Sequence, residues 1–180
     1  PHLADLATHA DLKPSRLQFA HEGDRFGGAH GIHALLHLAR HQGEGVVAVV
    51  RISEALQVSR KFLERILADL RQEGMVESQS GRDGGYRLGA AGLDLCLADV
   101  VRVLEGPIAL LPCASHRFYA PCAECASPET CALQDALVSV RNATVHSLKQ
   151  ITLAHVLETE GALMLGQKSL LRPTPYHEGQ

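Results

Sequence analysis

The chain of 180 residues carries a net charge of −3 and is 46% hydrophobic, with no Trp and only 4% aromatic residues. Its length suits one domain, or one small domain with an appended element, and it lacks the roughly 18 consecutive apolar residues of a transmembrane helix. The acidic charge argues against a generically basic nucleic-acid binder. However, segment 51–87 holds seven Lys or Arg against six Asp or Glu, whereas the rest of the chain holds ten against fourteen. This distribution permits a polyanion-facing surface within 51–87.

Residues 1–25 have mixed polarity and include Pro14 and Gly23, so we expect a weakly ordered N-terminal extension. They lack a basic region followed by an apolar block, so we expect no signal peptide. The chain contains five cysteines, an odd number. Without an export signal, this number indicates the reducing cytoplasm rather than a disulfide framework.

A periodic apolar pattern predicts an amphipathic helix over Gly28–His41. Four histidines, His30, His33, His37 and His41, recur at helical spacing and are expected to share one face of this helix. The simpler interpretation is a polar face that happens to use histidine. A metal-binding or proton-sensing role is the alternative.

The segment that follows has the pattern of a winged helix-turn-helix. Val46–Leu56 predicts a brief β arm that runs into a small helix, and Ser59 is suited to cap the next helix. Apolar residues recur along that second helix as one stripe, formed by Phe62, Leu63, Ile66, Leu67 and Leu70. Gly74 is a natural end for it. MVES and YRL are then expected as two short strands around the Gly-rich tip QSGRDGG.

The second helix of such a motif lies in the major groove of DNA, with its N-terminal side chains on base edges and phosphates. We therefore assign DNA contacts in this helix to four residues, Ser59, Arg60, Lys61 and Arg65. In the hairpin, Arg82 can reach the adjacent backbone or minor groove, and Gly84 permits a tight tip. An ordinary solvated helix face would explain the helix residues taken alone. The neighbouring hairpin favours DNA binding.

The C-terminal half is expected to contain three further elements. A helix over Leu95–Glu105 ends at Gly106-Pro107, and an irregular cysteine-rich segment follows it. From Pro128 to Gln150 apolar residues recur every three or four positions, which predicts a helix of about 33 Å. Because a small domain does not need that length for its own core, pairing with a partner helix is indicated. Thr152 is expected to cap a short last helix.

Four of the five cysteines lie close together in the sequence, spaced C-x8-C-x2-C-x5-C, at Cys113, Cys122, Cys125 and Cys131. Thiolates are soft ligands that select zinc, cuprous copper or iron–sulfur clusters. Core cysteines usually lie in apolar segments, whereas these lie among Pro, Ser, Glu and Arg, so a shared thiol site is favoured. Three kinds of site stay open: an iron–sulfur cluster, a four-thiolate zinc site, and a thiol–disulfide switch of Cys122 with Cys125.

The sequence gives little support to an enzyme. It contains no phosphate-binding Gly loop, no nucleophile elbow and no HExxH motif. A small electron-carrying iron–sulfur protein is a further class, and the helix-turn-helix and the long helix argue against it.

Several motifs in this order resemble the Rrf-two family of bacterial transcription regulators, the IscR/NsrR-like proteins. They are Phe62-Leu63-Glu64, Ile66-Leu67, Leu70, Gly74-Met75-Val76, Ser78, Ser80-Gly81 and Gly84-Gly85-Tyr86. Further matches are ALLHLA from Ala34, ADVVRVLEGP from Ala98 and ITLAHV from Ile151. The similarity covers about residues 26–157, most of the chain.

The resemblance implies a mainly α fold with a small β-wing, in which a winged helix-turn-helix is joined to a long C-terminal dimerisation helix. Its expected parts are a DNA-binding domain at 26–106, a cysteine-rich sensor loop at 107–130, and the dimerisation helix with a short final helix at 131–158. The extension at 1–25 and a flexible tail at 159–180 flank them.

The resemblance further implies a cytoplasmic homodimer, without a membrane partner, that binds a pseudo-palindromic double-stranded operator and acts as a repressor. An iron–sulfur cluster, [2Fe–2S] or [4Fe–4S], held by the segment 113–131 would set its operator affinity. Zinc is the alternative metal.

The chain departs from the family at two places. The family has Arg before the first wing glycine, where this chain has Ser80, so the minor-groove contact is expected to shift to Arg82. Cys125-x5-Cys131 resembles the second and third of three family cysteines, and Cys113 and Cys122 compete for the first position. In some relatives helix one of the partner subunit supplies a last ligand. His33 is the candidate for it here.

Overall fold

The computed structural model describes residues 27–122, 125 and 127–171. The extension expected at 1–25 and the last part of the expected tail lie outside these residues. The main elements, in chain order, are α1 (Gly27–Arg40), α2 (Val49–Leu56), α3 (Arg60–Gln72), β1 (Val76–Gln79), β2 (Gly85–Leu88), α4 (Leu97–Leu104), α5 (Ala132–Gln150) and α6 (Leu153–Met164). Short 3₁₀ turns lie at η1 (Gly92–Asp94), η2 (Pro112–Ala114) and η3 (Pro128–Thr130). The expected mainly α fold with a small β-wing is confirmed.

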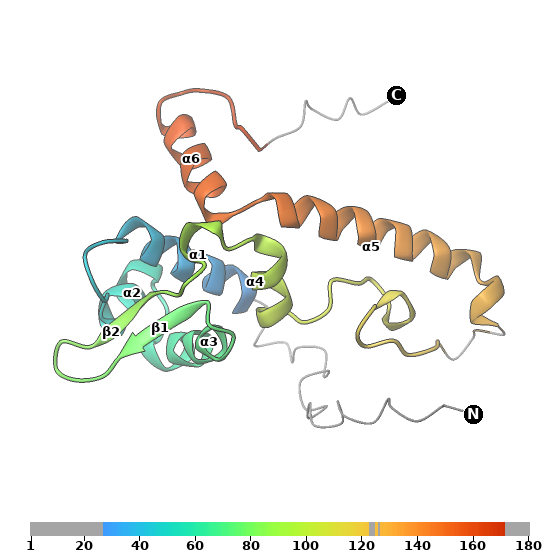
Figure 1. Cartoon of the computed structure of the whole chain (residues 1–180), viewed down its shortest axis with the longest axis horizontal. Helices are drawn as coiled ribbons and strands as arrows, with labels where there is room; N and C mark the ends of the chain where they lie inside the picture. The colour runs from blue at the N-terminus through green and yellow to red at the C-terminus, as the bar shows by residue number, and fades with distance from the viewer. Residues whose placement is uncertain (1–26, 123–124, 126, 172–180) are drawn as a thin grey trace, which may run out of the picture.

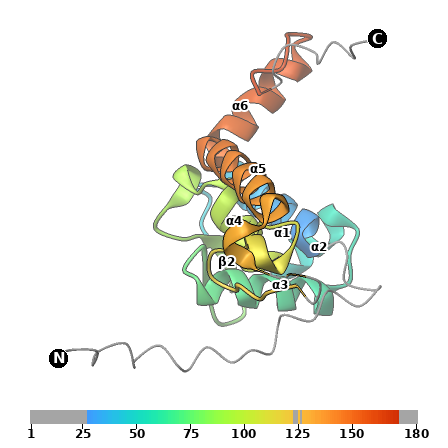
Figure 2. The same cartoon turned by 90° about the vertical axis from the view of Figure 1, so that its right-hand side faces the viewer.

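The elements form a body and an arm (Figure 1). Helices α1 to α4 and the hairpin make up the body, and α5 extends away from it with the η2 segment alongside. Figure 2 shows α6 rising from the junction of α5 with the body, on the side opposite to α3. Among the described residues, no helix is both long and apolar enough to cross a membrane.

The core of the body is aliphatic, as the scarcity of aromatic residues requires. It is formed by residues from five helices, both strands and adjoining loops, and its most completely buried large side chains include Leu35, Ile52, Leu63, Leu67, Leu70, Val76, Val100 and Leu153. The predicted stripe of the second helix is confirmed, because Leu63, Ile66, Leu67 and Leu70 of α3 are buried. These side chains fix which face of α3 is turned outward.

The β-hairpin is held to the body by one further backbone pairing. β1 pairs antiparallel with β2, with Val76 opposite Leu88. Val47 forms a bridge to Tyr86, with N–O distances of 2.8 and 2.9 Å, so the predicted β arm is a single pairing residue before α2. A Cβ atom at Gly85 would collide with the Val47 carbonyl, which explains a glycine at this position.

Helix α4 packs closely against α1 at two glycines. The backbone N–H of Gly28 donates to the Glu105 carboxylate at 2.6 Å, at the start of α1. A Cβ atom at Gly31 would collide with the side chain of Leu104. Two glycines on one face of α1 therefore allow the C-terminal end of α4 to approach its backbone.

Helix α5 begins later than the sequence predicted. Pro128–Thr130 forms a 3₁₀ turn, and the extended backbone of Cys131 separates this turn from α5. The helix has 19 residues, a length of about 29 Å instead of about 33 Å. No residue of α5 is buried, and Leu133 and Val140 are 60% and 50% exposed.

Helix α6 begins as predicted and ends later. Thr152 is its N-cap: the Thr152 hydroxyl accepts from the His155 N–H at 3.3 Å, and the His155 ring returns a bond to the Thr152 N–H at 3.5 Å. The helix continues to Met164 because Thr159 and Ala162 are buried. The first part of the segment expected as a tail is therefore helical.

Candidate DNA interface and thiol site

The N-terminal end of α3 presents the residues that the sequence assigned to DNA. Ser59 is the N-cap, as predicted, and its hydroxyl accepts from the Phe62 N–H at 3.2 Å. Arg60, Lys61 and Arg65 are exposed. The Arg60 guanidinium lies 2.8 Å from the Glu64 carboxylate, an exposed pair that adds little to stability and leaves the arginine able to change partner.

The turn before α3 contains a left-handed residue that the sequence pattern does not predict. Gln57 adopts a left-handed conformation with φ of 55°, and its N–H donates to the Glu54 carbonyl at 3.2 Å. The next N–H, of Val58, donates to the Ser53 carbonyl at 3.1 Å. This tight turn sets the direction of α3 relative to α2.

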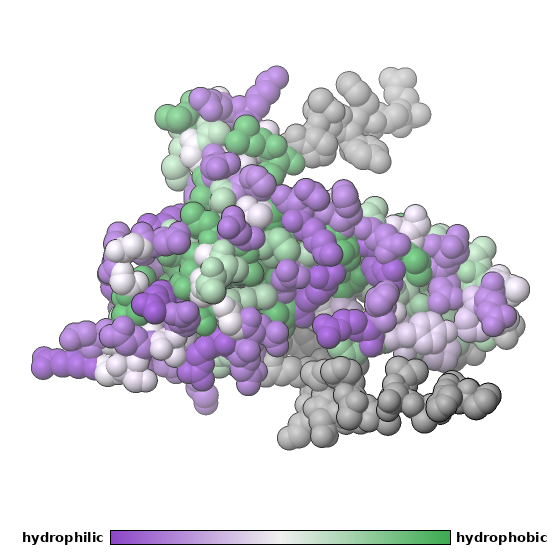
Figure 3. Space-filling view, viewed as in Figure 1, coloured by the Kyte–Doolittle hydropathy of each residue, from purple (hydrophilic) through white to green (hydrophobic). Residues whose placement is uncertain are grey.

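The hairpin tip carries Arg82, whose side chain is exposed. Gly81 has a φ of 117°, and a Cβ atom at Gly84 would collide with the carbonyl of Gln79, so both glycines are needed for the tight tip. Arg87, on β2, instead lies 2.7 Å from Glu77 on β1. Figure 3 shows the hairpin end of the molecule as strongly hydrophilic.

The hairpin and α3 lie side by side in the body (Figure 1), and the Arg71 guanidinium donates to the Ser78 hydroxyl across them at 3.1 Å. A winged helix contacts base edges with its helix and the adjacent DNA backbone or groove with its wing. The placement of α3 beside the hairpin is therefore suited to contact with neighbouring grooves of one DNA site.

The four clustered cysteines lie on the segment that runs beside α5. Cys113 belongs to η2 and is buried, with 6% of its surface exposed. Cys131 is the N-cap of α5, and its Sγ accepts from the Gln134 N–H at 3.4 Å. Cys122 and Cys125 are half-buried, and the Cys125 N–H donates to the Cys122 carbonyl at 3.1 Å.

These thiols influence one another electrostatically. Burial raises the pKa of Cys113, and the neighbouring Cys122 and Cys131 raise it further. Burial also raises the pKa of Cys125, again with added effects from Cys122 and Cys131. Several thiolates in one place repel each other, and a bound cation removes that penalty.

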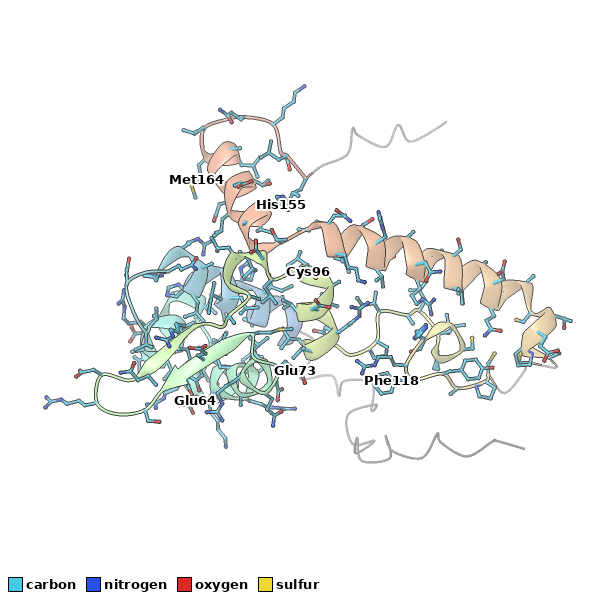
Figure 4. All side chains as sticks on the ribbon, viewed as in Figure 1. Glu64, Glu73, Cys96, Phe118, His155 and Met164 are labelled. Atoms are coloured by element: carbon cyan, nitrogen blue, oxygen red, sulfur yellow. The ribbon has the colours of Figure 1, made fainter. Side chains whose placement is uncertain are left out.

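The donor set fits a soft metal or an iron–sulfur cluster, since it consists of four thiols in one neighbourhood. Within 27–122, 125 and 127–171, however, no three His, Cys, Asp or Glu side chains converge tightly enough to hold a metal ion. The fifth cysteine is separate: Cys96 is the N-cap of α4, and its thiol donates to Asp99 at 3.2 Å. Figure 4 shows Cys96 on the body and Phe118 on the loop beside α5.

The histidines of α1 lie in different environments. His30 contacts Phe62 of α3 edge-on, with ring centroids 5.5 Å apart. His37 and His41 stack at 4.5 Å. His33 is exposed and lines an open groove of about 490 Å³ between α1 and α6. Its predicted role as a ligand in the partner subunit stays a prediction.

His37 has an unusual environment. Its Nε2 atom is buried and has no hydrogen-bond partner among the described residues. Burial lowers the pKa of His37, and His41, Arg40 and Arg51 lower it further. The neutral imidazole is therefore favoured in the folded protein.

Two side chains of α5 that the sequence did not single out hold the cysteine segment. Gln134 Nε2 donates to the Cys113 carbonyl at 2.9 Å, and Arg141 Nη1 donates to the Ala114 carbonyl at 2.7 Å. We call this pair the α5 clamp. Each partner is more than twenty positions away in the sequence, so no local pattern could have indicated the contacts.

Comparison with known proteins gives consistent results. Residues 27–159 match the model of the Rrf2 (Rrf-two) family, described as iron-dependent transcriptional regulators. The rrf2-like HTH-type transcriptional regulator of Rhodobacter capsulatus is 34% identical over 131 residues, which are 71% of this chain and 87% of the relative.

Two solved structures are similar to this fold. CymR (YrzC), named as the global cysteine regulator of B. subtilis, has a TM-score of 0.57 and 30% identity, and the match covers 71% of this chain and 89% of CymR. IscR of T. potens has a TM-score of 0.60 and 27% identity, with 79% and 90% covered.

Proposed function

This chain belongs to the Rrf2 family of transcriptional regulators, and from that premise we propose that an iron–sulfur cluster on its thiols controls how its winged helix binds an operator. As a member of this family it is a DNA-binding regulator and not an enzyme. We place it in the cytoplasm, where the operator lies and free thiols persist.

We propose that the protein binds a pseudo-palindromic operator as a homodimer. Helix α5 supports this, because a 19-residue helix with no buried residue leaves apolar side chains such as Leu133 and Val140 without burial in one chain. In this arrangement 26–106 is the DNA-binding part, 107–130 the sensor loop and 131–158 the dimerisation part.

Each chain would insert the N-terminal end of α3 into the major groove, with Ser59, Arg60, Lys61 and Arg65 as contacts. The wing would place Arg82 and the backbone at Gly84 on the adjacent groove. Exposure of the cationic side chains and the contact between α3 and the hairpin support this proposal. When bound at its operator, the protein would act as a repressor of transcription.

The observation that carries the cofactor proposal is the mutual effect of the thiols. Cys122 and Cys131 raise the pKa of both Cys113 and Cys125, which supports a shared site for these four residues. The cluster would supply iron that either reacts with a cellular signal molecule or is released in response to it. The chain's own cysteines would provide the thiolates. The loop at 107–130 and α3 would be the elements whose arrangement changes.

Control of DNA binding follows from linkage. If the loaded and cofactor-free dimers bind the operator with different affinities, loss of the cofactor changes operator affinity by that ratio and no more. The elements that would move are the loop at 107–130 and α3, which carries Arg60 and Lys61.

Anaerobic purification tests the cofactor. We expect a brown protein with visible absorption, bound iron and acid-labile sulfide. Cys125→Ser and Cys131→Ser should lose the iron and keep the circular dichroism of the wild type. A Cys131→Ser protein that retains all its iron would show that the ligand assignment is wrong.

Operator binding is the second half of this test. Arg60→Ala and Lys61→Ala should weaken binding of the operator duplex while iron content stays unchanged. This separates the DNA-contacting residues from the metal ligands. A loss of both properties in these variants would contradict the division of roles.

A thiol–disulfide switch is the second candidate. The Cys125 N–H donates to the Cys122 carbonyl, which keeps the backbones of these two cysteines close. A colourless protein that loses two thiols on mild oxidation would favour it. A colourless protein with stoichiometric zinc would favour a four-thiolate zinc site.

A further inference from the structure

The α5 clamp holds two consecutive carbonyl groups of the cysteine segment. Gln134 binds the Cys113 carbonyl at 2.9 Å and Arg141 binds the Ala114 carbonyl at 2.7 Å. Positions seven apart lie on the same side of a helix, so both side chains face η2. The Asn142 side chain accepts from the same guanidinium at 2.6 Å and helps to fix its direction.

Gln134 makes a second bond that involves another cysteine. Its backbone N–H donates to the Cys131 Sγ at 3.4 Å, while its side chain holds the Cys113 backbone. A single residue therefore joins the first and last cysteines of the segment. Hydrogen bonds to sulfur and to the groups that orient a ligand alter the affinity and potential of thiolate sites.

The clamped segment is also the buried part of the loop. Cys113, Ala114 and Ser115 are all buried, and the Ser115 hydroxyl accepts from the Phe118 N–H at 3.1 Å. Breaking a hydrogen bond to a buried carbonyl leaves that group without solvent to replace it. Cys122 and Cys125 are only half-buried. The position of Cys113 is thus more closely defined than theirs.

We propose that Gln134 and Arg141 are positioning residues of the thiol site. They hold Cys113 beside Cys131, so that the Cys113 thiol takes part in the site. The clamp also makes α5 part of the sensor, because a displacement of Cys113 reaches α5 through the same two bonds. The proposal rests on the thiol site of the proposed function, and its first test needs no cofactor.

That first test measures thiol accessibility in the reduced, cofactor-free, full-length protein. Alkylation by iodoacetamide is followed for each cysteine by mass spectrometry. We expect Cys113 to react about tenfold faster in Gln134→Leu and in Arg141→Leu, since each variant loses a hydrogen bond to a buried carbonyl. Arg141→Lys keeps one donor and should largely restore the slow rate.

Matched controls lie at the other end of α5. Gln150→Leu and Lys149→Leu remove the same kinds of side chain from exposed positions outside the clamp and should leave Cys113 unchanged. Cys96, which lies on the body, is the internal reference. An equal rise in the Cys96 rate would indicate general loosening and overturn the positioning role.

The second test measures release of iron from the reconstituted protein to a chelator. Loss of a group that orients a ligand typically costs about 10–100-fold in metal affinity, so release should accelerate by that order in Gln134→Leu. Unchanged alkylation of Cys113 in both clamp variants would overturn the clamp. A wild-type protein that binds no iron would contradict the proposed function and leave the alkylation result interpretable.

Discussion

Each helix of the winged-helix body buries part of one face, whereas α5 buries no residue at all. The body is also closed by bonds between distant elements, such as Gly28 to Glu105 and Val47 to Tyr86. In the arm, by contrast, the bonds of the α5 clamp and of the α5 N-cap are made to Cys113, to its neighbour Ala114 and to Cys131. The body is thus ordered by its own buried contacts, whereas α5 is left exposed and, in the proposed dimer, would be covered by a second copy.

The strongest test of this contrast is a cavity in the body. Leu67→Ala should lower the free energy of unfolding by about 2–5 kcal/mol, because Leu67 is fully buried in α3. Urea titration followed by circular dichroism measures it. The control Leu163→Ala, at a half-exposed position of α6, should change the free energy far less. Equal effects would remove the distinction between buried and exposed positions.

A charge on the outer side of α5 tests the arm. Val140→Lys should weaken self-association by roughly tenfold or more if Val140 is covered by a second copy. Analytical ultracentrifugation over a concentration series measures the dissociation constant. Lys149→Ala is the control on the same helix. A Val140→Lys protein that dimerises like the wild type would place the interface elsewhere.

The wing offers a test in which two arginines are compared. Arg82→Ala should weaken operator binding about tenfold and reduce the salt slope by about 1, as loss of a phosphate or groove contact predicts. Arg87→Ala, a control whose side chain is paired with Glu77, should have a smaller effect. Fluorescence anisotropy at several salt concentrations measures both. A larger effect for Arg87 would reverse the assignment.

The smallest expected effect concerns pH. Because the folded state lowers the pKa of His37, the unfolded chain binds a proton first as pH falls through about 6.5. The free energy of unfolding should therefore decline below about pH 6.5 and level off once the folded form is also protonated. His37→Gln should flatten this decline. Urea titrations between pH 5 and pH 8 measure it.

The elements that sequence predicted well are those determined locally. Ser59 and Thr152 are predicted correctly as caps because a Ser or Thr hydroxyl before a helix can accept from an N–H three residues on, as both do here. The stripe of α3 follows from helical periodicity alone. The predicted start of α5 is too early because Cys131, whose residue type is an unusual cap, ends the 3₁₀ turn and begins the helix.

The parts that sequence could not predict depend on residues far apart in the chain. Glu105 bonds to Gly28 across 77 positions, and Arg141 bonds to Ala114 across 27. The predicted end of α6 is too early because burial of Ala162, a tertiary effect, carries the helix through Gly161. The assigned thiol and DNA residues themselves stay predictions until the experiments above are made.

Helix α5 also fixes a distance. Cys131 stands at one end of it and the junction with the body at the other, where the Leu97 N–H bonds to the Ile151 carbonyl at 2.8 Å. A helix of this length is a spacer of about 29 Å, several times the roughly 8–10 Å over which physiological salt screens exposed charges. In the proposed arrangement, the charge of the thiol site would therefore be screened at the far end of α5. Under the proposed function, a signal from the thiols would have to pass mechanically along the loop beside α5, or to a second copy bound against α5.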